Sequence, residues 1–258
     1  MKRRLVNGII SATTAMVLTV SGTAQPARAA IPWPQIAVAV VSYLYGGSGG
    51  GSDLERAKQE IIAAVETSKQ EILNHIDAIA AADVEACTEA AVTKIAQIDS
   101  MPGSLLGPFV NGAVDCAALS NAYLNAVQDP RAADNIGKLM GVIHSIAMVA
   151  FAKYNLSTND LLNGLIRGYE NLVTKLAPAC RDDTIREYDS LGRLVTVEIT
   201  HTCVAYNGNS ASGTELYYQG RPMNTIDRAL ISKNATRNTS RWTAQESLPT
   251  LIQLRPVA

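Results

Sequence analysis

The chain has few residues of the kinds that most often carry enzyme chemistry or fill an aromatic core. Aromatic residues make up 5% of the sequence, with two Phe, and there are three His. No two His have the H-E-x-x-H spacing of a zinc protease, and the chain has no nucleophile elbow, Walker loop or dinucleotide fingerprint. The sequence therefore predicts a core of aliphatic residues and Ala, and it assigns no catalytic, cofactor-binding or metal-binding residue.

Acidic residues are absent from residues 1–29, which have the order of features found in a secretory signal peptide. Basic residues lie within Met1–Arg4, an apolar stretch runs from Leu5 to Val20, and Ala27–Ala29 forms an A-x-A cleavage site. A membrane anchor is the alternative, but the apolar stretch is short for a span and contains several polar residues. We expect cleavage near Ala29 and a secreted, extracellular protein.

Removal of residues 1–29 changes the charge balance. Four of the 22 Lys and Arg and none of the 23 Asp and Glu lie in that segment, so 18 basic and 23 acidic residues remain, a net charge of −5. A mildly acidic chain has no overall electrostatic attraction for nucleic acid, and we expect none as a partner. Residues 219–258 differ, with six basic and two acidic residues.

Residues 30–52 combine an apolar segment with a linker. A helix is expected over residues 34–45, since Pro is tolerated in a first helical turn. Gly46–Ser52 contains only Gly and Ser and is typical of a flexible linker, either a hinge or a tether that lets the apolar tip dock elsewhere. The apolar side chains that need burial are Trp33, Ile36, Val40, Val41 and Leu44.

Gly and Pro are both absent from residues 53–101, so the usual helix breakers are missing. Ser52 and Glu55 form a capping box at the start. Apolar residues then recur with helical spacing: Ile61, Ile62, Val65, Ile72, Ile76 and Ile79. We predict one long helix, with coiled-coil character in its first half and an Ala-rich second half. Its acidic residues are interpreted as a solvated face.

Three further helices are predicted, over residues 108–128, 131–153 and 157–176, to complete a bundle. Residues 139–152 are almost entirely apolar. That run is too short to span a bilayer, so it is interpreted as a buried core helix.

The sequence after Cys180 favours β-structure. Residues 184–188 and 193–206 are rich in β-branched residues and flank Asp189–Gly192, which predicts a hairpin. A third strand is expected near residues 215–219 and a short helix over 224–233. Residues 234–258 show no clear period.

The four cysteines are expected to form two disulfides, Cys87–Cys116 and Cys180–Cys203. Each pair lies symmetrically about a predicted turn, the first about Met101-Pro102 and the second about Leu191-Gly192. In the hairpin, a three-residue turn places Cys180 opposite residue 202, and a bulge would bring it opposite Cys203. Four free thiols or a metal site are the alternatives. Export favours oxidation, and neither pair has the C-x-x-C spacing typical of zinc.

The histidines and the hairpin acids are the candidates for chemistry. His75 is interpreted as a helix-surface residue, and His144 as a buried neutral imidazole bonded to a backbone carbonyl. His201 shares the inward face of the second strand with Cys203 and is interpreted as a packing residue. If the protein is a hydrolase, its site is expected at His201 with Asp182, Asp183 and Glu187. A charged turn region is the simpler interpretation of these acids.

One short motif resembles a known family. Residues 188–194, Tyr-Asp-Ser-Leu-Gly-Arg-Leu, resemble a single YD/RHS-type repeat unit, whose pattern is Tyr-Asp, two residues, then Gly-Arg-Leu. Many copies build a β-shell in that family, and one copy implies only a hairpin here. The rest of the chain resembles exported helical proteins of bacteria, a resemblance that implies no functional residue.

These observations predict an α+β, mainly α protein: a helical bundle followed by a small disulfide-stapled β-hairpin unit. The expected parts are residues 1–29, the signal peptide; 30–52, the apolar segment and linker; 53–178, the bundle; 179–220, the hairpin unit; and 221–258, a basic segment. The leading function is a secreted, non-enzymatic interaction or structural module that binds a secreted or cell-surface protein or a second copy of itself. Alternatives are a membrane-active, pore-forming-type protein and a secreted hydrolase.

Overall fold

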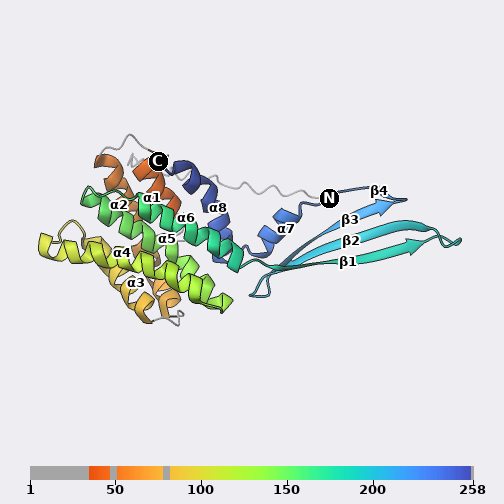
Figure 1. The fold of residues 1–258 in the computed structure, drawn as a ribbon, viewed down its shortest axis with the longest axis horizontal. Coiled ribbons are helices and arrows are strands. Elements are labelled where there is room, and N and C mark those ends of the chain that lie inside the picture. The colour runs from red at the N-terminus through yellow and green to blue at the C-terminus, as the bar shows by residue number, and fades with distance from the viewer. Residues whose placement is uncertain (1–34, 47–50, 78–81, 257–258) are drawn as a thin grey trace, which may run out of the picture.

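The protein consists of a helical bundle and an antiparallel sheet that projects from one end of it, with helix α7 between them (Figure 1). The computed structural model describes residues 35–46, 51–77 and 82–256. The expected signal peptide, Trp33 and most of the Gly/Ser linker lie outside the described residues. The predicted α+β, mainly α class is confirmed.

Helix α5, Pro130–Lys153, forms the centre of the bundle. It starts at Pro130 after Asp129, whose carboxylate caps the helix by accepting the Arg131 N–H at 3.1 Å. Residues 132–137 and 139–150 are all buried. The helices packed around it are α1 (Ile36–Tyr45), α2 (Gly51–Asp77), α3 (Ala82–Lys94), α4 (Gly103–Ala126), α6 (Asn159–Lys175) and α8 (Ser240–Leu254).

The interpretation of residues 139–152 as a core helix is thus confirmed. Among the described residues, α5 is the one helix that has the length and apolar composition to cross a membrane. In this structure 83% of its most apolar window is buried inside the protein.

The apolar N-terminal segment forms helix α1, which lies in the bundle. Ile36, Val40 and Val41 are almost completely buried, and α1 packs against α2, α5 and α8. The Tyr45 hydroxyl forms a 2.6 Å hydrogen bond with the hydroxyl of Thr158. The segment is therefore part of the bundle core, rather than a tip extended on a tether.

The single long helix expected over residues 53–101 is instead two helices, α2 and α3, followed by a short 3-10 turn at Ile95–Gln97. Ile72 in α2 and Val84 in α3 are both buried. Twelve residues separate them, so in one straight helix of 3.6 residues per turn they would point about 120° apart. Two helices can turn both residues into the core. The coiled-coil character of α2 stays a prediction.

Helix α4 begins earlier than expected, at Gly103, with Pro102 at its N-cap and Pro108 inside the helix. The expectation that this helix starts at residue 108 was wrong. Pro108 is the sixth residue of the helix, past the first turn, so α4 lacks one backbone N–H···O=C bond there, a local cost that the packing of α4 on α5 offsets. Cys87 of α3 and Cys116 of α4 form the expected disulfide, here called the bundle disulfide.

A small polar network lies inside the bundle around His144. Its Nδ1–H donates to the Met140 carbonyl at 3.0 Å, which leaves Nε2 to accept from the Asn121 amide at 3.2 Å. The same amide nitrogen donates to the Gly164 carbonyl at 3.2 Å. Burial lowers the pKa of His144 to about 4, so the ring is neutral at pH 7, as expected from the sequence.

The sheet has three long strands, β1 (Ala179–Tyr188), β2 (Leu194–Val204) and β3 (Ser210–Tyr218), and a two-residue strand β4 (Arg221–Pro222). It is antiparallel, in the order β1-β2-β3-β4. The register of β1 against β2 shifts between Glu187 and Tyr188, and this bulge places Cys180 opposite Cys203. The two form the second expected disulfide, here called the sheet disulfide.

The C-terminal segment contains more structure than its sequence indicated. Helix α7, Arg228–Ala235, packs on β2 and β3, where Ile231 and Ala235 cover Cys203. Residues 240–254, which show no clear period, form α8 on the bundle. Pro249 inside α8 is the residue that obscured this helix in the sequence.

Candidate functional site

Strand β1 forms an open edge of the sheet. Among the strands that the structure describes it pairs with β2 alone, and all ten of its residues are exposed. The opposite edge is covered by residues 221–224. There the Asn224 side chain accepts from the Leu216 N–H at 2.7 Å and donates to the Thr214 carbonyl at 2.8 Å, and Met223 N–H donates to the Leu216 carbonyl at 2.7 Å. Residues 221–224 cover the opposite edge only from Thr214 to Tyr218, so β1 is the edge whose whole length lacks a partner strand among the described residues.

The backbone groups that point outward from β1 can be identified from the ladder. The Ala205 N–H bonds to the Asn209 carbonyl across the β2–β3 turn, so alternate residues of β2, including Cys203, direct their backbone groups toward β3. Cys180, opposite Cys203, is then a non-hydrogen-bonded partner, which agrees with their Cα separation of 4.0 Å. Asp182, Thr184 and Arg186 share that phase, so their N–H and C=O groups point away from β2.

Half of the β1 residues are charged: Arg181, Asp182, Asp183, Arg186 and Glu187. Arg181 and Asp183 form an exposed ion pair at 3.3 Å. Within the part of the chain that the structure describes, the side chains of Arg186 and Glu187 form no hydrogen bond or ion pair. Charges on an edge strand oppose indiscriminate pairing with other strands, so this edge is selective as well as open.

Apolar side chains are exposed toward the tip of the arm formed by the sheet. Ile185 and Tyr188 on β1 are each 60% exposed, and Leu191 in the β1–β2 turn is 75% exposed. Side chains of this size in water near a free strand edge are typical of a surface that binds another molecule.

A charged cluster lies at the base of the arm, beside the sheet disulfide. Asp182 is directly opposite His201, whose Nδ1–H donates to Asp182 Oδ1 at 2.6 Å. Arg228, at the start of α7, donates to Asp182 Oδ2 at 2.7 Å and lies 3.5 Å from Glu215. Both hydrogen bonds lower the pKa of Asp182, and the bond from Arg228 has a larger effect than the bond from His201. The cluster ties β1, β2, β3 and α7 together.

The hydrolase site suggested by the sequence assembles only in part. His201 and Asp182 meet, but Asp183 and Glu187 alternate onto the other face of the sheet. His201 Nε2 lies 3.4 Å from Cys203 Sγ, a sulfur already bound to Cys180, rather than facing a hydroxyl or a substrate cleft. His201 is 8% exposed and packs between the sheet and α7.

Cys180, His201 and Cys203 place potential metal-ligand atoms within 4.8 Å of one another. Both sulfurs are held in the disulfide, so neither is available as a thiolate ligand. We therefore assign no metal here. The side chain of His75, on α2, lies outside the described residues.

The residues that resemble a YD/RHS unit form the turn at the tip. Asp189 Oδ1 accepts the backbone N–H groups of Leu191 and Arg193, each at 2.9 Å, and its Oδ2 accepts from the Arg193 guanidinium at 2.8 Å. Gly192 has φ of 76°, which favours Gly. The motif thus has a local structural purpose: its Asp, Gly and Arg close the hairpin.

The joint between arm and bundle is polar and buried. Asp134 of α5, 1% exposed, accepts from the Ser240 N–H at 2.6 Å, the Ser240 hydroxyl at 2.7 Å and the Tyr206 hydroxyl at 2.8 Å. Arg241 donates to the Val173 carbonyl at 2.9 Å, near the end of α6, and its burial lowers its pKa. A guanidinium at a helix C-terminus is favourably placed for the carbonyl groups there. The Tyr206 contact anchors the arm to α5, and the Ser240 and Arg241 contacts fix the start of α8, where the chain re-enters the bundle, to α5 and α6.

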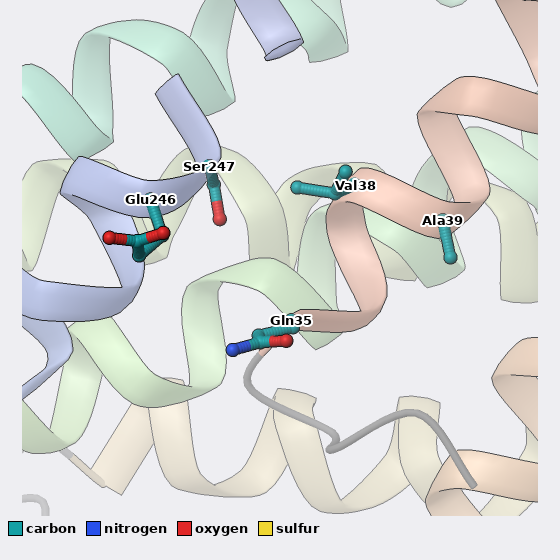
Figure 2. A pocket seen from close by; sticks show the side chains of 5 residues that line it. All are labelled: Gln35, Val38, Ala39, Glu246 and Ser247. Atoms are coloured by element: carbon teal, nitrogen blue, oxygen red, sulfur yellow. The ribbon is translucent and has the colours of Figure 1, made fainter. Parts of the chain in front are cut away.

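A hollow lies on the bundle, between α1 and α8, with a volume of about 320 Å³. Figure 2 shows Gln35 and Val38 of the α1 side and Glu246 and Ser247 of α8 around it. The Glu246 carboxylate is paired with Lys233 of α7. The other lining residues, Gln35, Val38, Ala39 and Ser247, carry no charge, so the hollow offers little chemistry for recognition.

No protein-family model, curated protein or solved structure matches this chain.

Proposed function

We propose that this protein is an exported, non-enzymatic interaction module in which the bundle is the scaffold and the sheet is the binding arm. The observation that carries the proposal is the open β1 edge, ten exposed residues long and followed by an apolar tip. Addition of a strand to a free edge is a recurrent mode of protein recognition: the backbone supplies affinity, and alternate side chains supply specificity.

The two disulfides are consistent with an extracellular protein. Together with the signal-peptide pattern of residues 1–29, they support a secreted location. The partner is then a secreted or cell-surface protein, or a second copy of the chain. The polar joint at Asp134 supports the same function, because it fixes the binding arm to the bundle.

The test compares capture by three forms of the mature chain, residues 30–258: wild type, Ile185→Lys and Leu105→Lys. Leu105 lies on α4 and is 60% exposed, like Ile185, so it controls for the loss of one exposed apolar side chain. Each form is immobilised and exposed to culture medium and intact producer cells. We expect wild type and the control to bind the same protein and the arm variant to lose it. Equal capture by all three would contradict a binding arm.

Membrane activity is a second candidate, favoured by the length and apolar composition of α5. It requires the bundle to open, because α5 is buried here. Dye release from neutral and anionic vesicles is the measurement. Leakage would support this candidate, and intact vesicles at both neutral and acidic pH would eliminate it.

A further inference from the structure

We propose that the occupant of the β1 edge is a second copy of this chain, paired antiparallel with the first about a two-fold axis that passes through Thr184. The inference rests on the proposed function, since it names the partner of the same edge. A two-fold axis normal to the sheet keeps each face of the sheet on one side. Residues equally spaced on either side of Thr184 then lie opposite each other.

This register matches the charges of β1. Arg181 lies opposite Glu187 of the second copy, and Asp182 lies opposite Arg186 of the second copy. Each pairing occurs twice by symmetry, and no like charges meet. Directly opposed unlike charges stabilise an antiparallel pair, and like charges destabilise it. The pairing also gives partners to Arg186 and Glu187, the two charges on β1 that form no ion pair within the described part of one chain.

Neighbouring registers are worse. An axis through Asp183 places that carboxylate opposite itself. An axis through Ile185 places Asp183 opposite Glu187 twice. Moving the axis by two residues from Thr184 in either direction also sets a like charge opposite itself. A centre between two residues is excluded, because it would oppose side chains from different faces. Of these centres, Thr184 is the one that sets unlike charges opposite each other and no like charges directly opposite.

The backbone phase fits as well. Thr184 is one of the residues whose N–H and C=O point outward, so the two Thr184 residues exchange a pair of hydrogen bonds across the axis. Asp182 and Arg186 have the same phase and form the pairs on either side. Because the pairing is isologous, each β1 edge is occupied by the β1 of the other copy, so addition through this edge stops at two copies rather than continuing into a filament.

The geometry of the arm leaves room for both bundles. β1 runs from the bundle to the tip of the arm (Figure 1), so antiparallel pairing places the bundles at opposite ends of a joined sheet. The tip turn of each copy, with Leu191, then lies beside the α6–β1 connection of the other. That contact would cover one of the most exposed apolar side chains of the arm.

The test uses charge reversal in the mature chain and sedimentation over a concentration range. Wild type is expected to form a reversible dimer that weakens in 0.5 M NaCl, because the pairs are exposed. Arg181→Glu alone, or Glu187→Arg alone, sets like charges opposite each other twice and is expected to weaken association by on the order of tenfold. Leu105→Lys should have no effect.

Mixing the two single variants gives the sharpest readout. In a mixed dimer every Glu again faces an Arg, so the mixture, and also the double variant Arg181→Glu/Glu187→Arg, should associate as wild type does. If the single variants were weak only because each chain folds poorly, mixing them would not restore association. Thr184→Pro removes an outward N–H that β2 does not use, so it should give a folded monomer, with circular dichroism as the check on folding.

Three results would overturn the second-copy proposal: a monomeric wild type at hundreds of micromolar, single reversals that dimerise as wild type does, or a mixture that stays monomeric. A monomer whose arm captures another protein would leave the proposed function standing and exclude only the second copy. A monomer with no arm-dependent capture would contradict both.

Discussion

Acid should destabilise this protein through His144 in particular. The ring is buried, and its two nitrogens are committed, one as a donor to Met140 and the other as an acceptor from Asn121. A proton on Nε2 would face the N–H of Asn121. The pKa of His144 is lowered from 6.5 to about 4 in the folded state, mainly by burial. In the unfolded chain the ring titrates near its ordinary value.

The size and direction of the effect follow from linkage. Between pH 6.5 and 4 the unfolded chain binds a proton that the folded chain does not, so stability falls as the pH falls. The full loss is about 3 kcal/mol, from a difference of about 2.5 between the two pKa values at 1.36 kcal/mol each. Between pH 7.5 and pH 5 the expected loss is about 2 kcal/mol.

The assay is urea unfolding of wild type and His144→Gln at pH 7.5 and pH 5. Glutamine keeps a donor and an acceptor but does not titrate. The other groups titrate alike in both proteins, so the difference between the two pH dependences isolates His144. We expect wild type to lose about 2 kcal/mol more than the variant. Equal losses would refute the buried neutral histidine, whatever the variant costs at pH 7.5.

Three other perturbations test the packing. Serine in place of both cysteines of the sheet disulfide should expose the arm to limited proteolysis while the helical circular dichroism persists, whereas the same change in the bundle disulfide should leave the arm protected. Each crosslink stabilises the fold by about 3.5 kcal/mol by chain entropy, but the arm has a far smaller core than the bundle and depends more on its crosslink. Protection of the arm from proteolysis after loss of the sheet disulfide would contradict this reasoning. Tyr169→Phe should raise the free energy of unfolding in urea by about 1 kcal/mol, because the buried hydroxyl has no partner among the described residues; a lower free energy would mean that the hydroxyl is bound. Gly168→Ala should cost about 1–2 kcal/mol, because a Cβ there would lie 2.3 Å from the Asn121 side-chain oxygen; an unchanged midpoint would show that Asn121 moves freely.

Much of the architecture was accessible from the sequence because turns and apolar periods are local signals. The symmetric positions of the cysteines about two turns led to both disulfides, and the one-residue mismatch in the hairpin indicated a bulge, which the structure places between Glu187 and Tyr188. The apolar run of α5 predicted its burial. These inferences needed only the spacing of residues along one or two elements.

The rest depended on how distant elements meet. The bulge sets the register that brings Asp182 opposite His201; without it, Asp182 would lie opposite Thr200, on the other face. The sequence interpretation grouped Asp182 with Asp183 and Glu187 by proximity along the chain, and the pleat separates them. Helix α8 was missed because Pro249 interrupts its pattern, and its stability comes from packing against α1, α5 and α6.

The joint has a consequence for modular design. The chain leaves the bundle after α6 and re-enters it at α8, and the contact between Arg241 and Val173 shows that exit and re-entry are adjacent. Residues 176–239 are therefore a long insertion between the neighbouring helices α6 and α8, and this insertion forms the arm. A short linker could replace the whole loop and leave a closed bundle, or a different binding element could be grafted there. Truncation before α8, in contrast, would remove a helix from the core rather than trim a tail.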